Sequence, residues 1–356
     1  MNRRQVTRVV TCLMLAGASS CAVIEQAVPK SSGVGQFLTE QGEANRRASE
    51  MQQECEALKA RSISFEEESA FGGAVSVNWV SQGGGLTGRA DAKALHVQLN
   101  KLGKNLAAQS SRPHLPWTFG VLQSPGVNAV SGPGGYVFVS EGLLAQLDNE
   151  AQLAGVLAHE IAHITGKHAL DEYQAYLVEQ CQKGADAERS RVLVKRGSEV
   201  VQEQGRQLGQ GLTQVLPASK LREFFTGVVK DFDFNKAGTE VIQAITNGVV
   251  ARLVEKGFQK EDEFAADQDA VELMAAAGYA PEEYVSFLSK LPERGLSTAH
   301  PSKGERQKRL REHLDRLRAS VPENEFTTPV DLSRTKVVPL RDALQTGRAG
   351  SAARAE

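Results

Sequence analysis

The segment His159-Glu160-Ile161-Ala162-His163 lies in one of the most apolar stretches of the chain. Residues four apart on an α-helix share a face, so His159 and His163 point their imidazoles at one spot. Zinc binds imidazole nitrogens at about 2.0–2.1 Å, and such a pair is half of a tetrahedral site. Glu160 lies one step round the helix, where its carboxylate can take a proton from an attacking water. The segment therefore predicts a Zn²⁺ site, one per chain, with Glu160 as the catalytic base.

We expect this segment to lie on a helix that runs from about Glu150 to Tyr176. The first half of that helix is apolar nearly all round, which is typical of a buried helix. Asp148 or Asn149 is suited to cap its N-terminus, and Gln152 is placed for a capping box. Polar groups on a buried helix cost several kcal/mol unless they have partners. The two histidines and the glutamate therefore indicate a metal site rather than solvent-facing side chains.

A catalytic zinc site needs a third protein ligand and an open fourth position. In the later sequence Glu-Asp-Glu-Phe-Ala-Ala-Asp, Glu263 offers that ligand, and Asp267 shares its face four residues on. Asp267 can accept the second N–H of a ligand histidine, which fixes the tautomer. Glu261 is a rival ligand, but the residue four positions after it is an alanine. On a continuing helix His168 points away from the site, so we expect a surface histidine or one that contacts a ligand.

Three short extended segments precede the buried helix. Trp117–Leu122 alternates in polarity, Val127–Val130 is a second short piece, and Tyr136–Ser140 follows a Pro-Gly-Gly turn at residues 133–135. Most of the remaining chain has helical periodicity. The sequence predicts an α+β fold, predominantly helical, with a small sheet beside the helix that carries His159.

Composition limits the partners of the chain. Its 356 residues include 41 Lys and Arg against 43 Asp and Glu, so the formal net charge is −2. The basic footprint of nucleic-acid-binding proteins is missing, and we expect no nucleic-acid partner. No run of about 18 or more apolar residues occurs, so the sequence predicts no transmembrane helix.

Residues 1–20 have the organisation of an export signal. Arginines precede a short apolar region and then a run of small residues, and the apolar region is too short to span a bilayer. Cys21 follows in a context similar to the bacterial lipobox, although Ala18 stands where leucine is usual. We expect Cys21 to be lipidated, and the alternative is an ordinary cleaved signal with an incidental cysteine. Ala22, by resemblance to the usual sorting pattern, favours a periplasmic protein anchored to the outer membrane.

The segment after the signal carries two further expectations. Cys55 and Cys181 remain in the exported chain, and an oxidising compartment would permit them to pair; two separate thiols are the alternative. We expect a helix over Gly42–Arg61, and we expect the acidic run Glu66–Glu68 to be the solvated start of another.

Several motifs follow one another in a characteristic order. They are Asn128-Ala129, Pro133 to Val139, Asn149-Glu150, the His159–His163 segment with Lys167-His168, Glu263 to Asp267, and His300-Pro301-Ser302 with Arg306. Together, over about residues 60–315, they resemble the HtpX, BepA and LoiP group of gluzincin metallopeptidases, related to the CAAX prenyl proteases and the mitochondrial Oma-type enzymes. The resemblance implies a zincin-like metallopeptidase whose zinc ligands are His159, His163 and Glu263 and whose base is Glu160.

The resemblance also implies further roles. In relatives an edge strand pairs with extended peptide, and here that strand would be Tyr136, Val137, Phe138 and Val139. His300 would either stabilise the oxyanion or occupy the fourth zinc position in a resting state, and a plain loop histidine is the alternative. Arg306 would brace the loop of His300 or pair with substrate.

The implied organisation has four parts. They are a signal peptide at 1–20, a tether and helix at 21–60, a zinc metallopeptidase domain at 61–318 with a helical insert at 177–260, and a flexible tail at 319–356. The insert is long for the group and would form a lid, a membrane-facing surface or a partner site.

The implied function is that of an endopeptidase of the bacterial cell envelope acting on unfolded or misassembled proteins. An alternative is a proteolytically latent, metal-containing chaperone or assembly factor, and a third is processing of one specific partner. Glu160 argues against a purely structural zinc, because a site closed by four protein ligands needs no base.

Overall fold

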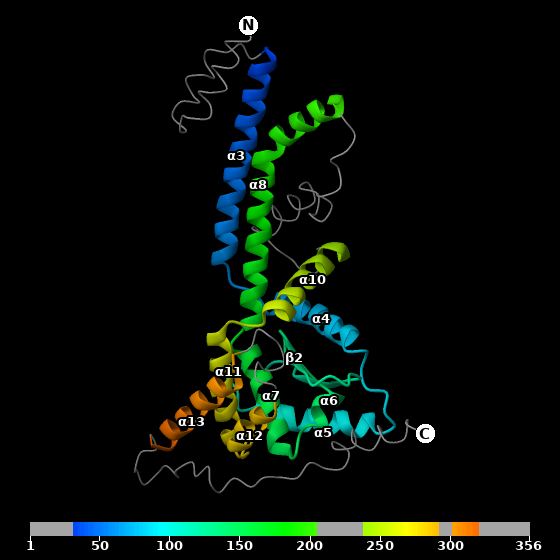
Figure 1. Cartoon of the computed structure of the whole chain (residues 1–356), viewed down its shortest axis with the longest axis vertical. Helices are drawn as coiled ribbons and strands as arrows, with labels where there is room; N and C mark the ends of the chain where they lie inside the picture. The colour runs from blue at the N-terminus through cyan, green and yellow to red at the C-terminus, as the bar shows by residue number, and fades with distance from the viewer. Residues whose placement is uncertain (1–30, 205–237, 292–300, 320–356) are drawn as a thin grey trace. The chain divides into compact units, whose positions relative to one another are not determined.

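The computed structural model describes residues 31–204, 238–291 and 301–319. These residues form two compact units (Figure 1). One unit holds residues 31–61 and 177–204, and the other holds the rest of the described chain. None of the helices in these stretches combines the length and the hydropathy needed to cross a bilayer.

The first unit is a pair of long helices. Helix α3 (Gly33–Ala60) lies beside the part of α8 (His168–Gln204) that starts at residue 177 (Figure 1). A disulfide joins Cys55 to Cys181, with 5.6 Å between their Cα atoms, so the pairing that the sequence left open is present. Helix α3 starts earlier than expected, because the Ser32 hydroxyl accepts the N–H of Gly35 at 3.0 Å and caps it.

The second unit contains a three-stranded sheet in the order β1-β3-β2. Strands β1 (Thr118–Leu122) and β3 (Tyr136–Ser140) are parallel, and β2 (Ala129–Gly132) is antiparallel to β3. Gly134 and Gly135 have φ angles of 78° and 100°, which only glycine adopts readily, and they form the tight turn between β2 and β3. Strand β3 is the central strand of the sheet, because it pairs with β1 on one side and β2 on the other.

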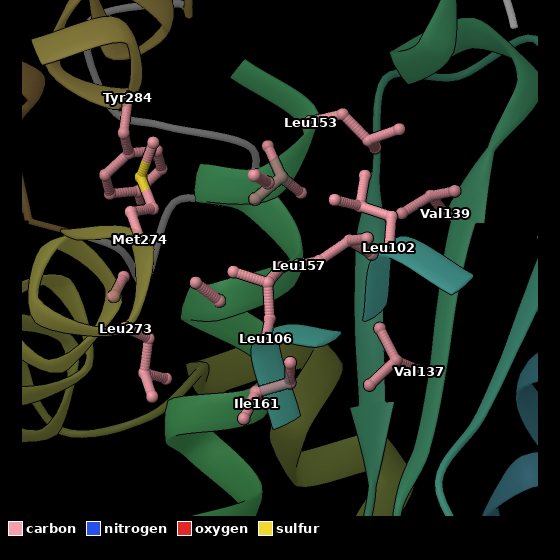
Figure 2. Packing of buried hydrophobic residues seen from close by; sticks show 14 of the residues in the cluster. Leu102, Leu106, Val137, Val139, Leu153, Leu157, Ile161, Leu273, Met274 and Tyr284 are labelled. Carbon is pink, nitrogen blue, oxygen red and sulfur yellow. The ribbon is translucent and has the colours of Figure 1, made fainter. Parts of the chain in front are cut away.

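Helix α7 (Glu150–Thr165) is buried between the sheet and two later helices, α11 (Lys260–Ala276) and α12 (Glu282–Lys290). The Asn149 side chain caps it by accepting the N–H of Gln152 at 2.9 Å. Figure 2 shows how its apolar side chains fill the core between β3 and α11. The labelled residues are Leu102, Leu106, Val137, Val139, Leu153, Leu157, Ile161, Leu273, Met274 and Tyr284. The predicted α+β fold, with a small sheet beside this helix, is confirmed.

The other described helices surround this centre. They are α4 (Phe65–Gln82), α5 (Ala92–Ala107), α6 (Glu141–Leu144), α10 (Thr239–Lys256) and α13 (Lys303–Ala319).

The prediction of one helix from Glu150 to Tyr176 is wrong. Helix α7 ends at Thr165, Lys167 takes a left-handed φ of 63°, and α8 begins at His168. A left-handed residue stops a right-handed helix, so the chain changes direction before it continues as a helix.

The expectation of a solvated acidic start is also wrong for two of its three residues. Glu67 and Glu68 are buried, with exposed fractions of 5% and 3%. The Tyr173 hydroxyl donates to Glu67 at 2.7 Å. Arg112 donates to both carboxylate oxygens of Glu68 at 2.9 and 2.7 Å, and the N–H of Gly134 adds a third bond at 3.1 Å. These partners allow carboxylates to be buried.

Candidate metal centre

Helices α7 and α11 bring the three predicted ligands together. The Nε2 atoms of His159 and His163 are 3.1 Å apart, and oxygens of Glu263 lie 3.7 and 3.6 Å from them. In a tetrahedral site with bonds of about 2.0–2.1 Å, ligand atoms are about 3.3–3.4 Å apart. The separations therefore fit one cation of the size of zinc. Within the described ranges, this is the only group of three or more His, Cys, Asp or Glu residues close enough to share a metal ion.

The other ring nitrogens of the two histidines also lie close to polar atoms. Nδ1 of His159 lies 3.1 Å from Oδ1 of Asp267, and Nδ1 of His163 lies 2.8 Å from Nδ1 of His168. We assign the proton of each ligand ring to Nδ1, because a carboxylate or an unprotonated ring nitrogen accepts it there. The two Nε2 lone pairs then face each other at close range, which a shared cation stabilises.

Asp267 is held by a buried cluster. Arg306 donates to its two oxygens at 2.7 and 2.6 Å, and the Tyr284 hydroxyl donates to Oδ1 at 2.9 Å. Burial alone would raise the pKa of Asp267, but the charge and hydrogen bonds of Arg306, with help from His159, hold that pKa well below its usual range. Asp267 therefore stays ionised and accepts the proton of His159, as predicted from the i, i+4 spacing.

The pKa values of the neighbouring groups fit the same arrangement. Burial alone would lower the pKa of His159, but the hydrogen bond and charge of Asp267 outweigh it and raise that pKa. Burial and the Asp267 charge raise the pKa of the Tyr284 hydroxyl, so it remains a donor. Arg306 thus pairs with Asp267. This contact was not among its expected roles, which were to brace the loop of His300 or to pair with substrate. Sequence reasoning missed Tyr284, which reaches the site from α12.

The charges of the buried site sum to a value that a divalent cation balances. Glu160, Glu263, Asp267 and Arg306 are at most 8% exposed. Counted as ionised, they carry three negative charges and one positive charge, a sum of −2. Uncompensated buried charge costs several kcal/mol per ion. Donor types, separations and charge therefore all fit a divalent metal ion, with zinc the expected ion for two imidazoles and a carboxylate.

Glu160 faces a pocket on the side of His159. The empty volume of this pocket, including the part open to solvent, is about 420 Å³. A second pocket, of about 210 Å³, lies beside His163 and is lined by Ser131 and Gly132 of β2. The predicted base therefore borders a partly open pocket beside the ligand His159. The larger pocket has apolar walls formed mainly by Ala129, Leu143, Val156, Phe287, Leu288 and Leu291.

The outer edge of β1 is occupied by other parts of the unit. The Asn100 side chain accepts the N–H of Phe119 at 3.1 Å and donates to its carbonyl at 2.7 Å. The ring of His96 accepts the N–H of Val121 at 3.1 Å, and the N–H of Thr87 donates to the Val121 carbonyl at 2.9 Å. A peptide therefore cannot add a strand beside β1.

The outer edge of β2 has fewer hydrogen-bond partners than that of β1, although Ser131 and Gly132 are buried. The N–H of Ser140 donates to the carbonyl of Asn128, so, by alternation along an antiparallel pair, the backbone groups of Ala129 and Ser131 point away from β3. The indole N–H of Trp79 donates to the Ser131 carbonyl at 3.1 Å. Among the described residues, the N–H and C=O of Ala129 and the N–H of Ser131 have no partner.

The predicted substrate strand does not lie at an edge. Tyr136, Val137, Phe138 and Val139 belong to β3, which pairs on both sides, and the last three are buried. The prediction that this strand is the peptide-binding edge is wrong, because β1 and β2 both pair with it. His300, Cys21, the signal at 1–20 and residues 320–356 of the expected tail lie outside the described residues.

Comparisons with known proteins agree with this geometry. The profile of peptidase family M48 matches residues 93–314, more than half of the chain. A β-barrel assembly-enhancing protease of Escherichia coli K12 is 25% identical over 203 residues, 57% of this chain and 34% of the relative. A protein of the same name from Yersinia pestis is 38% identical over 79 residues, 21% of this chain and 16% of the relative.

The mitochondrial metalloendopeptidase OMA1 of Schizosaccharomyces pombe is 39% identical over 76 residues, 21% of this chain and 23% of the relative. The chain thus spans about a third of the length of the Escherichia coli relative, and shorter parts of the other two. The extent of the profile match and the His-His-Glu site together show that the chain belongs to peptidase family M48, a family of metallopeptidases.

Proposed function

We propose that this chain is a zinc-dependent endopeptidase that hydrolyses peptide bonds in extended or unfolded polypeptides. The observation that supports it most is the position of Glu160, a buried carboxylate that borders a pocket beside His159 of the His-His-Glu cluster. The described residues supply three ligands, which is the number typical of catalytic zinc sites.

His159, His163 and Glu263 would hold the zinc ion. When bound, zinc polarises the scissile carbonyl and lowers the pKa of water. Glu160 takes the proton of the attacking water and returns it to the leaving amine. Asp267 holds the ring of His159 in the tautomer that leaves Nε2 unprotonated, and Arg306 keeps Asp267 ionised.

Substrate would add a strand to β2 rather than to β3. The outward N–H and C=O of Ala129 and the outward N–H of Ser131 offer hydrogen bonds that do not depend on substrate sequence, which suits unfolded chains. The two pockets lie at either end of this strand, one against Ala129 and one against Ser131. The proposal also keeps His300 as a second candidate catalytic residue, because it precedes the buried Pro301 at the start of the helix that carries Arg306.

We further propose that the chain acts in the bacterial cell envelope on unfolded or misassembled proteins, in the periplasm, with lipid at Cys21 anchoring it to the outer membrane. The disulfide between Cys55 and Cys181 supports an oxidising compartment. The names of two relatives point to the assembly of β-barrel proteins as the process served.

An assay with unfolded casein tests the proposal. The wild type should cleave casein, lose activity with a zinc chelator and regain it when zinc is added. Glu160→Gln should lose activity by about 10²-fold or more and still bind zinc, because the base is not a ligand. Glu261→Gln is the matched control, since Glu261 is exposed in the same helix as Glu263, and it should stay active. Full cleavage by Glu160→Gln, or by the metal-free protein, would contradict the proposal.

A further inference from the structure

The turn between α7 and α8 returns a histidine to the metal site. After α7 ends at Thr165, Lys167 takes a left-handed conformation, and α8 begins at His168. Nδ1 of His168 then lies 2.8 Å from Nδ1 of His163. On one continuous helix these residues, five positions apart, would not face each other in this way.

We propose that His168 is a positioning residue that fixes the tautomer and orientation of His163, and that Gly166 is glycine because the ring of His168 needs the space. This inference deepens the proposed zinc-dependent function and rests on it. It concerns only the orientation and tautomer of the His163 side chain.

The proton arrangement follows from the contacts. For Nε2 of His163 to face the other ligands with a lone pair, its Nδ1 must carry the proton. Nδ1 of His168 accepts that proton, which leaves the His168 proton on Nε2, 3.8 Å from Oδ1 of Asp262. The opposite arrangement, with His168 donating from Nδ1, would place a proton on Nε2 of His163 and block the ligand position.

The ring of Phe258 limits the movement of His163 in a second direction. The two rings stack with centroids 4.1 Å apart and planes 22° from parallel. The ring of His168 meets His163 at an angle of 77°, with centroids 5.0 Å apart. One contact therefore fixes the plane of the His163 ring, and the hydrogen bond to His168 fixes its rotation within that plane.

Gly166 has a geometric reason to lack a side chain. Its backbone is in the ordinary right-handed region, with φ −71° and ψ −10°, so an alanine would meet no backbone strain. A Cβ atom built there would lie 2.5 Å from Nε2 and 2.9 Å from Cε1 of His168. An added methyl group would therefore displace the imidazole of His168, which is the movable partner.

The two ligand histidines are thus oriented by different kinds of group. Asp267, which orients His159, is charged and needs Arg306 to balance it. His168 orients His163 through an imidazole nitrogen, Nδ1, rather than through a carboxylate.

Zinc affinity of the purified protein, measured by competition with a chromogenic chelator, tests the proposal. His168→Ala should bind zinc about 10- to 100-fold more weakly, as removal of a hydrogen bond to a ligand does elsewhere. His168→Asn should bind close to wild type, because its Oδ1 can take the place of Nδ1. Gly166→Ala should weaken binding as His168→Ala does. His313→Ala is the matched control, since His313 pairs with Glu272 and does not contact the ligands.

Thermal unfolding with chelator present separates affinity from folding, and all variants should unfold as the metal-free wild type does. The proposal is overturned if His168→Ala binds zinc as tightly as the wild type, or if His168→Asn binds as weakly as His168→Ala. A Gly166→Ala variant of wild-type affinity overturns the assignment of Gly166. A wild type that binds no zinc would instead contradict the proposed function, so the two failures are distinguishable.

Discussion

Oδ1 of Asp267 in α11 lies 3.1 Å from Nδ1 of His159 in α7, so a carboxylate from one helix orients the ligand of another. Both side chains are buried, and Arg306 neutralises the carboxylate. The metal centre therefore depends on the packing of two helices that are distant in sequence.

We expect Asp267→Asn to bind zinc about 10- to 100-fold more weakly than the wild type. The amide lacks the negative charge that raises the basicity of His159, and it can present an N–H donor toward Arg306. Chelator competition measures the change. Asp269→Asn, an exposed position in the same helix, is the control and should bind normally. Equal affinity of both variants would mean that Asp267 does not tune the ligand.

Arg306→Met should lower the free energy of unfolding by about 3–5 kcal/mol, because it leaves the Asp267 charge buried without its partner. Arg311→Met, an exposed change in the same helix, should alter it by less than about 0.5 kcal/mol. Denaturant titrations measure both values. A small loss in Arg306→Met, equal to that of the control, would contradict this role for the pair.

The pH dependence of that loss has a defined sign. The pKa of Asp267 is depressed in the folded chain, so its stabilising contribution is present above the unfolded pKa of about 3.9 and declines as pH falls toward the folded value. The difference between wild type and Arg306→Met should therefore be largest near neutral pH and shrink in acid. A difference that grows in acid would show that another group is responsible.

Ser131→Pro should reduce kcat/KM for an unfolded substrate by about 2- to 10-fold. It removes one outward N–H of β2, and one hydrogen bond is worth about 0.5–1.5 kcal/mol. Proline is tolerated on an edge strand when the missing N–H faces outward. Ser131→Ala keeps the N–H and should retain the wild-type value. If both variants cleave as well as the wild type, the substrate does not pair with β2.

The ligands could be predicted because their spacing is a property of the helix itself. His159 and His163, and then Glu263 and Asp267, are each four residues apart, and any α-helix places such pairs on one face. The strands beside the Pro-Gly-Gly turn could be predicted for a similar local reason. The site then requires only that α7 and α11 pack together, and the apolar and small residues of these helices favour that packing.

Other features depended on information that local patterns do not carry. The role of His168 follows from the left-handed conformation of Lys167, which its residue type does not announce. The burial of Glu68 depends on Arg112, which is distant in sequence, and the central place of β3 depends on its pairing with both β1 and β2. Strand order and long-range ion pairs are decided by tertiary packing. The expectation for the strand therefore came from the family resemblance, and that for the acidic run from the usual exposure of charged residues.

The zinc content of Glu263→Ala, measured by mass spectrometry beside the wild type and Glu160→Gln, tests the central claim most directly. We expect about one zinc ion per chain in the wild type and in Glu160→Gln. Glu263→Ala should retain far less, because it lacks the ligand that α11 contributes to the pair on α7. A Glu263→Ala protein that keeps one zinc ion as tightly as the wild type would contradict the account.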